Sequence, residues 1–177
     1  MVELWTKNTE IEFFKQARTF AQPERLFYKT PENTYVAYWP KGYKGTKTTL
    51  QSRNSLIGSF TEKWSVDLLK EFAEKNKLYA KQGVICEEIG LNNKSPADVA
   101  FCKTDELIQM PENIITIFEV KMSIVWNWNL ITEQEKESFN CAGDYMSHKG
   151  NPGLLRSDTM LKAIGKSINI RVSSFHS

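Results

Sequence analysis

Apolar residues recur along this chain with two periods, one near 3.6 residues and one of two residues, and each period predicts a different kind of element. One-turn spacing is clearest over 59–77, where it predicts a helix with a buried stripe made of Phe60, Trp64, Leu68 and Phe72. Weaker helical spacing occurs over 9–21 and again from 158 onward. In the later helix we expect the buried side to be formed by Leu161, Ile164 and Ile168.

Runs of β-branched and aromatic residues, or an alternation of apolar and polar residues, predict strands. By this criterion the chain has strands at 25–28, 34–39, 81–89, 97–102, 114–122 and 168–173. The segment 132–153 is polar and becomes rich in glycine and asparagine, which predicts a loop, with or without a short helix.

Two of these predicted strands carry charges that need an explanation. Glu119 and Lys121 lie two residues apart near the end of the apolar strand 114–122, so both point to the same face. Asp98 lies near the start of the strand 97–102. If the two strands pair in a hairpin, two carboxylates and one ammonium meet in one small site. Charges in such an apolar setting are costly unless they are paired or hold a metal.

The residue types in this site favour one metal over another. Two hard oxygen ligands, with room for water and a phosphate, suit Mg²⁺ better than Zn²⁺. A lysine beside the metal can orient an attacking water, or deprotonate it if the site lowers the lysine pKa. The competing interpretation is an exposed edge hairpin on which Glu119 and Lys121 form a surface ion pair.

The same residues resemble the signature of a known family. Pro96-Ala97-Asp98, followed after twenty residues by Glu119-Val120-Lys121, is similar to the motif of the PD-(D/E)xK nucleases, which include most type II restriction endonucleases. In that family the proline usually directly precedes the aspartate. Here Ala97 separates them, a departure that leaves the type of ligand unchanged.

The resemblance implies a fold and a division of the chain. We expect an α/β (α+β) protein with a restriction-endonuclease-like core at 56–177, in which helices flank a mixed central sheet. Residues 1–55 would form an N-terminal helix and hairpin extension that contacts DNA. Restriction enzymes usually continue beyond the equivalent of the last strand, which implies either a shortened member or an incomplete reading frame.

It also implies roles for single residues. Asp98 and Glu119 would hold Mg²⁺, with the backbone carbonyl of Val120 as a further ligand, and Lys121 would act on the attacking water. Family members often carry another catalytic acid on the preceding helix, for which Glu62 is the candidate. The alternative, which we favour from the sequence, is a capping box in which Glu62 bonds the backbone of Ser59.

Composition and charge add possible partners. The chain has 177 residues, 41% of them hydrophobic, which is enough for one domain with a full core. The net charge of +2 is too small to indicate nucleic acid, but 33–61 and 159–177 contain no acid at all. Basic residues in and near these stretches are candidates for contacts with DNA phosphates: Lys41, Lys44, Lys47, Arg53, Arg156, Lys162 and Lys166. Ordinary charge on a solvated surface explains either stretch as well.

The sequence therefore predicts a Mg²⁺-dependent endonuclease that cuts double-stranded DNA, most simply a type II restriction enzyme acting as a homodimer. Two alternatives stay open: a structure-specific or repair nuclease of the same fold, and a DNA-binding protein without activity. The three cysteines show no Cys-x-x-Cys pair, and the sequence shows no signal peptide and no membrane span, so we expect a cytoplasmic protein.

Overall fold

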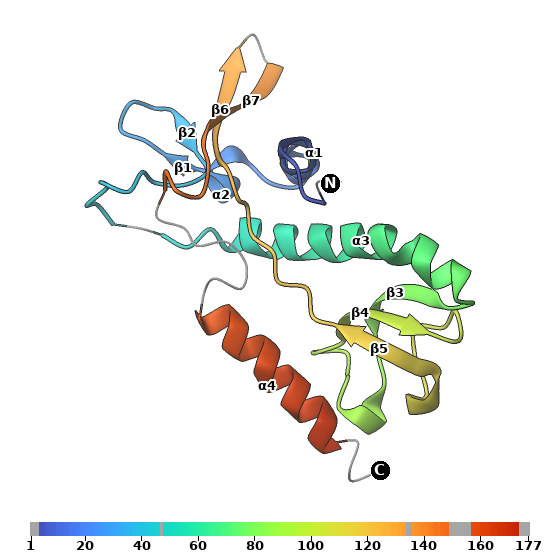
Figure 1. Ribbon diagram of the computed structural model, residues 1–177. Coiled ribbons are helices and arrows are strands. Elements are labelled where there is room, and N and C mark those ends of the chain that lie inside the picture. The colour runs from blue at the N-terminus through green and yellow to red at the C-terminus, as the bar shows by residue number, and fades with distance from the viewer. Residues whose placement is uncertain (1–3, 47, 134–135, 149–156, 174–177) are drawn as a thin grey trace. The chain divides into compact units, whose positions relative to one another are not determined.

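The structure, a computed structural model, describes residues 4–46, 48–133, 136–148 and 157–173 (Figure 1). The chain divides into two compact units, Met1–Ile57 with Ser123–Pro152, and Gly58–Met122 with Gly153–Ser177. The first boundary lies close to the one expected at position 55. The segment 123–152, which the sequence assigned to the core at 56–177, belongs to the first unit.

The first unit combines two helices with a four-stranded antiparallel sheet. The helices are α1 (Lys7–Arg18) and α2 (Pro23–Leu26), and the sheet has the order β1-β2-β6-β7. Its strands are β1 (Tyr28–Lys29), β2 (Tyr35–Val36), β6 (Asn127–Glu133) and β7 (Lys136–Gly143). Its core is aromatic: the ring of Phe14 stacks on Phe27, with centroids 4.7 Å apart, and on Phe139 at 5.4 Å.

Two sequence predictions fail in this unit. Most of 25–28 is not a strand, because Pro23 starts the short helix α2 and only Tyr28 enters β1. The loop predicted over 132–153 is wrong for its first part, since residues up to Glu133 belong to β6 and Lys136–Gly143 form β7, which pairs with it; 149–153 lie outside the described residues. The strand β7 lies at the edge of the sheet and none of its residues is fully buried, so its polar sequence gave no strand signal.

The second unit contains a three-stranded antiparallel sheet with the order β3-β4-β5. Its strands are β3 (Tyr79–Val84), β4 (Ala97–Cys102) and β5 (Ile114–Phe118), joined by the short turns η1 (Glu87–Ile89) and η2 (Pro111–Asn113). The central strand β4 buries every residue except Asp98, which is partly exposed. The unit also contains α4 (Ser157–Ser173) and most of α3 (Gln51–Lys75), a helix that begins in the first unit.

The predicted α+β class is confirmed, but the sheet differs from the expectation. The described strands of both sheets pair antiparallel, so the mixed central sheet is wrong. The strand predicted at 168–173 is the last part of α4. There Ile168 and Val172 are exposed and only Ile170 packs against the core. A sequence with an apolar residue at every second position also has apolar residues four positions apart. Because residues four apart lie on the same face of a helix, the pattern fits a helix as well as a strand.

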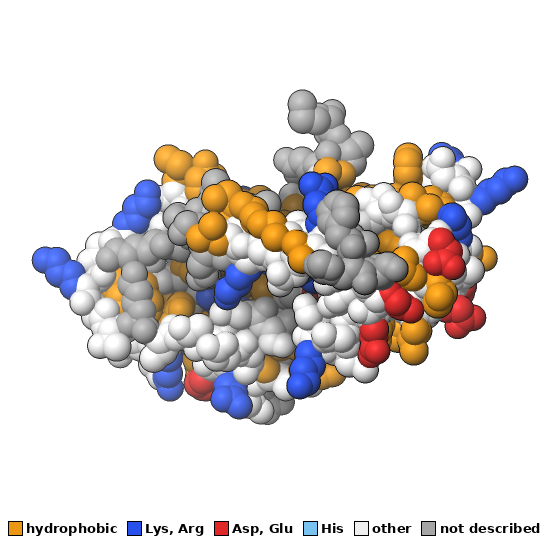
Figure 2. Space-filling view, turned by 90° about the horizontal axis from the view of Figure 1, so that it is seen from below, with side chains coloured by type: hydrophobic (Ala, Val, Ile, Leu, Met, Phe, Trp, Pro, Cys, Tyr) orange, Lys and Arg blue, Asp and Glu red, His pale blue; other side chains and the backbone are white. Residues whose placement is uncertain are grey.

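The buried sides predicted for the two long helices are also only partly correct. In α3, Leu68 and Phe72 are exposed. In α4, the residues expected to be buried are exposed: Leu161, Ile164 and Ile168. Figure 2 shows hydrophobic side chains at the surface on the face of the molecule that it draws. No helix within the part of the chain that the structure describes is long and apolar enough to cross a membrane.

Candidate active site

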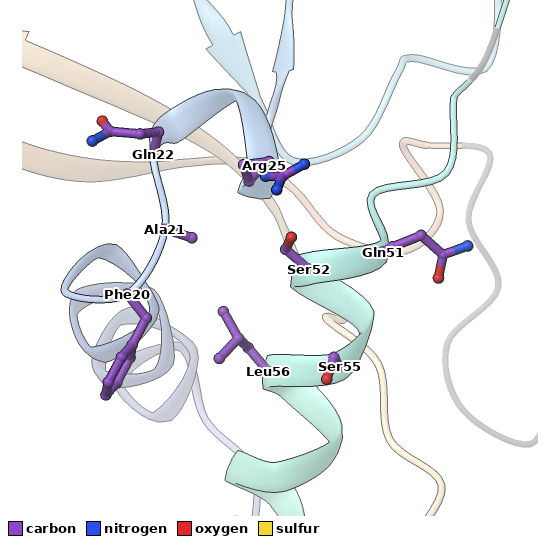
Figure 3. A pocket seen from close by; sticks show the side chains of 8 residues that line it. All are labelled: Phe20, Ala21, Gln22, Arg25, Gln51, Ser52, Ser55 and Leu56. Atoms are coloured by element: carbon purple, nitrogen blue, oxygen red, sulfur yellow. The ribbon is translucent and has the colours of Figure 1, made fainter.

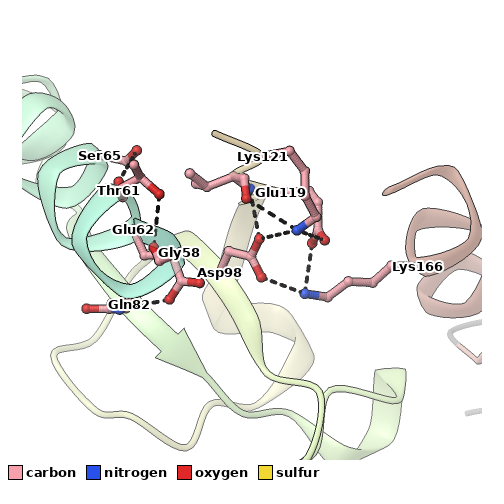
Figure 4. Close-up of polar contacts among 10 residues, drawn as sticks. Gly58, Thr61, Glu62, Ser65, Gln82, Asp98, Glu119, Lys121 and Lys166 are labelled. Atoms are coloured by element: carbon pink, nitrogen blue, oxygen red, sulfur yellow. Dashed lines mark hydrogen bonds and ion pairs between the residues drawn. The ribbon is translucent and has the colours of Figure 1, made fainter. Parts of the chain in front are cut away.

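The pairing of β4 with β5 brings Asp98 and Glu119 together. Val99 on β4 lies opposite Phe118 on β5, so the antiparallel register places Asp98 beside the residues that directly follow β5. Asp98 Oδ2 accepts the backbone N–H of Val120 at 2.9 Å, which holds that chain segment against β4 (Figure 4). The side chains of Asp98 and Glu119 are 12% and 17% exposed, so both carboxylates are mostly removed from water.

Two lysines neutralise this pair of carboxylates. Lys121 Nζ lies 2.9 Å from Asp98 Oδ2 and also contacts Glu119 Oε1. Lys166, from α4, lies 2.9 Å from Asp98 Oδ1 and 2.8 Å from Glu119 Oε2. Each ammonium therefore bridges the two carboxylates through a different pair of oxygens, and the four groups form a closed ring of alternating charge. The ring has no net charge.

The pKa directions follow from these contacts. Burial alone would raise the pKa of Asp98, but hydrogen bonds from Lys166 and Lys121 outweigh it and hold that pKa below its usual value. Burial would lower the pKa of Lys121, but its bonds to Glu119 and Asp98 raise it. Lys121 is therefore protonated at neutral pH in this arrangement. It can orient water or neutralise charge, and it cannot accept a proton while these contacts last.

The oxygens around Lys121 fit a hard metal ion. The three predicted metal-binding oxygens all contact its ammonium: Asp98 Oδ2, Glu119 Oε1 and the carbonyl of Val120, the last at 3.2 Å. Glu119 Oε2 is buried and accepts no hydrogen bond, so only the ion pair with Lys166 compensates it. Among the described residues no three His, Cys, Asp or Glu side chains gather as a metal-binding group. Two carboxylates, a carbonyl and water can nevertheless bind Mg²⁺, which commonly keeps several of its waters.

Glu62 has a different role from the one favoured on sequence grounds. Because α3 begins at Gln51, Ser59 lies inside the helix and the predicted capping box is wrong. Glu62 instead accepts a hydrogen bond of 2.8 Å from Gln82 on β3. Burial raises the pKa of Glu62, and the nearby charge of Asp98 raises it further. Glu62 is thus electrostatically linked to the carboxylate pair.

The predicted DNA-contacting residues fall into different settings. Lys41 and Lys44 are exposed in a loop of the first unit, and Lys162 is exposed on α4. Arg53 is buried: its guanidinium donates to the carbonyls of Leu26 and Ala37 and lies over two tyrosine rings, so its assignment as a phosphate contact is wrong. Lys47 and Arg156 lie outside the described residues.

Sequence reasoning missed what Lys166 contacts. It assigned Lys166 to phosphate binding because of the acid-free stretch around it. Its contact with Asp98 spans 68 positions of the chain and depends on where α4 packs. No local spacing carries that information.

Sequence reasoning also missed a buried carboxylate in the first unit. Glu10, on α1, is fully buried. Its oxygens accept the indole N–H groups of Trp5 and Trp128, at 2.9 and 2.7 Å. They also accept the backbone N–H groups of Val125 and Trp126, at 2.6 and 3.2 Å. A signal existed in the sequence, because Glu10 starts a helical stripe that continues with Phe13, Phe14 and Ala17.

Each unit has a surface pocket. In the first unit an open pocket of about 590 Å³ is lined by eight residues (Figure 3): Phe20, Ala21, Gln22, Arg25, Gln51, Ser52, Ser55 and Leu56. This lining contains no acid and so offers no carboxylate to a metal. In the second unit a pocket of about 330 Å³ adjoins Glu119 and Lys166. Only the second pocket is next to the charged ring.

No protein-family model matches the chain, and no curated protein or solved structure matches it significantly. A functional assignment therefore has to come from the chemistry of the site itself.

Proposed function

We propose that this protein is a Mg²⁺-dependent nuclease that hydrolyses phosphodiester bonds in DNA. One observation carries the proposal: Asp98, Glu119 and the Val120 carbonyl converge on the ammonium of Lys121. Three oxygens suited to Mg²⁺ and a lysine beside them can support metal-assisted phosphodiester hydrolysis, which uses a bound metal to activate water and positive groups to neutralise charge. A surface ion pair is a poorer explanation, because the side chains of Asp98, Glu119 and Lys121 are at most 23% exposed.

The protein groups have separate tasks in this proposal. Asp98, Glu119 and the carbonyl of Val120 would hold Mg²⁺, which when bound supplies positive charge to a phosphate and lowers the pKa of a coordinated water. Lys121 orients the attacking water and neutralises charge that develops on the phosphate. In the ion-paired arrangement its bonds to Glu119 and Asp98 raise its pKa, which fits this electrostatic role. Lys41, Lys44 and Lys162 are exposed and suit contacts with DNA phosphates.

Cleavage of a plasmid in Mg²⁺ tests the proposal. The parent protein should cut, and Asp98→Asn or Glu119→Gln should reduce the rate about a hundredfold to a thousandfold, as expected when a charge-stabilising group is lost. Asp67→Asn is the matched control, because Asp67 is an exposed acid on α3 and its replacement should not change the rate. If both site variants cut as fast as the control, the proposal is wrong.

The products of the same assay separate the finer alternatives. Discrete fragments would support a type II restriction enzyme, for which a two-fold homodimer explains cleavage of both strands. Gradual degradation, or cutting only at unusual structures, would support a repair or structure-specific nuclease. DNA binding without any cleavage would leave a DNA-binding protein without activity.

A further inference from the structure

The pocket of about 330 Å³ beside the charged ring has a mixed lining. Ile117 and Glu119 contribute from β5 and its end, and four residues of α4 contribute from the other side: Lys166, Ser167, Ile170 and Arg171. The volume is at the lower end of the roughly 300–1,000 Å³ common for small-ligand sites. The lining has two cations and one hydroxyl, and its single acid, Glu119, is already paired with Lys166. Its chemistry suits an anion that also has an apolar part.

Lys166 belongs to both the pocket and the ring, whereas Lys121 does not line the pocket. Both lysines bridge Asp98 and Glu119. Only Lys166 is among the residues around the pocket. The two lysines therefore make the same kind of ion pair with the carboxylates, but only Lys166 can contact a ligand bound in the pocket.

A cation bound to the carboxylates would change what Lys166 can do. In the present arrangement its ammonium is engaged by Asp98 Oδ1 and Glu119 Oε2. A divalent ion on the same carboxylates supplies their compensating charge and repels the ammonium. A phosphate oxygen in the pocket is then a partner within the space that Lys166 lines, and Ser167 and Arg171 line the same pocket.

We propose that this pocket binds a phosphate group of a nucleotide, and that Lys166 is a positioning residue that passes from the two carboxylates to that phosphate when Mg²⁺ binds. The inference rests on the proposed nuclease function and names the part of the substrate that lies next to the metal. Ile117 and Ile170 give the pocket apolar walls suited to a sugar or a base, so a nucleotide should bind more tightly than inorganic phosphate.

Thermodynamic linkage makes the inference measurable. If Mg²⁺ frees Lys166 for the phosphate, Mg²⁺ and the nucleotide must each raise the other's affinity by the same factor. Couplings of this kind are typically roughly 5–150-fold. We expect about tenfold or more here.

The experiment is a calorimetric titration of thymidine 5′-monophosphate with and without Mg²⁺. This nucleotide contains no diester bond, so Mg²⁺ itself can be used. The parent protein should show the coupling, Lys166→Met should lose it to within about twofold, and Lys121→Met should keep it. Both variants should bind Mg²⁺ more tightly than the parent, because each lacks one competing cation. Lys166→Arg retains the charge and should keep most of the coupling, which controls for a folding defect.

The possible results separate the two proposals. Coupling that survives in Lys166→Met would mean that the metal binds the phosphate directly. That result would overturn the role of Lys166 and leave the proposed nuclease function standing. Inorganic phosphate binding as tightly as the nucleotide would overturn the nucleotide assignment. If the parent protein does not bind Mg²⁺ at all, or if Glu119→Gln binds it equally well, the proposed nuclease site and this inference both fail.

Discussion

The molecule buries carboxylates in two places and compensates them in opposite ways. In the first unit, Glu10 accepts four hydrogen bonds from neutral N–H groups. In the second unit, Asp98 and Glu119 are held mainly by the ammonium groups of Lys121 and Lys166. Both arrangements compensate the buried carboxylates, although Glu119 Oε2 has an ion pair and no hydrogen bond. Only the second uses mobile counter-charges that another cation can replace.

From this difference we infer that the Glu10 cluster is structural, and we call the ring that would carry the proposed chemistry the chemical cluster. The neutral donors around Glu10 are two indole rings and two backbone groups, three of them on the segment 125–128 that enters β6, so they cannot turn to another partner as a long side chain can. The ammonium groups of the two lysines are at the ends of flexible side chains, so they can move from the carboxylates to a substrate. The pKa directions agree: burial raises the pKa of Glu10, whereas the lysines lower that of Asp98.

The largest effect we predict is on the chemical cluster, from Lys121→Met. Loss of an ammonium that orients water and neutralises charge should slow the chemical step about a hundredfold or more. Single-turnover cleavage at saturating enzyme measures this step without the contribution of DNA affinity. Lys121→Arg keeps the charge and should retain part of the rate, because the proposed role of Lys121 is to orient water and neutralise charge and not to take a proton. If both variants cut like the parent, the ion pairs are only structural.

The residues that distinguish the two clusters were not equally visible in the sequence. Asp98, Glu119 and Lys121 lie together, as pairing of the two predicted strands implied, and β4 has the bounds that the apolar run gave. The strand predicted at 114–122 is shorter, however: β5 ends at Phe118, so Glu119 and Lys121 follow the strand and do not alternate on it. The contacts of Lys166 could not be predicted without knowing how α4 packs. The hydrophobic pattern of α4 gave the wrong buried side, since Leu161, Ile164 and Ile168 were expected to be buried and are exposed. A charge on the packed face of a helix contradicts the usual hydrophobic pattern.

The fold, too, could be predicted from the sequence only in part. The helix pattern located α3, although its start at Gln51 was missed because the first five residues of the helix, 51–55, are all polar. The edge strand β7 gave no apolar signal, and 168–173 satisfied both the strand period and the helix period. Antiparallel pairing of every described strand was also beyond local patterns, because pairing depends on contacts between distant segments.

The second prediction addresses the structural cluster through Glu10→Leu. This change leaves two indole and two backbone N–H groups without their acceptor, which should cost about 3 kcal/mol or more of unfolding free energy. Urea denaturation measures the loss. Glu12→Leu on the same helix is the control, because Glu12 is exposed and its replacement should be nearly neutral. Cleavage per folded molecule should stay unchanged, and a rate loss like that of Lys121→Met would break the distinction between the clusters.

The third prediction uses pH, since the two clusters should respond in opposite directions. The pKa of Glu10 is raised above its ordinary value of 4.5, so its contribution is full below that value and is lost as pH rises through the folded-state pKa. The pKa of Asp98 is lowered from 3.8, so its contribution is present above that value and is lost as pH falls through the folded-state pKa.

Urea denaturation of the parent, Glu10→Gln and Asp98→Asn between pH 3 and pH 7 should reveal this contrast. The stability advantage of the parent over Glu10→Gln should shrink as pH rises above about 4.5, and its advantage over Asp98→Asn should shrink as pH falls below about 3.8. Parallel curves for the two comparisons would show that the clusters are not electrostatically different.

The smallest predicted effect concerns Glu62, which is near the chemical cluster without belonging to its ring. Its carboxylate accepts a hydrogen bond from Gln82, and the nearby charge of Asp98 helps to raise its pKa. Glu62→Gln keeps a hydrogen-bonding side chain and removes one negative charge, whose interaction through a partly solvated site is about 1 kcal/mol. Mg²⁺ affinity measured by calorimetry should therefore fall by about fivefold, while the rate at saturating Mg²⁺ stays within about twofold of the parent. A rate loss of about a hundredfold at saturating metal would place Glu62 among the groups that act directly on the reaction, and the chemical cluster would then extend to α3.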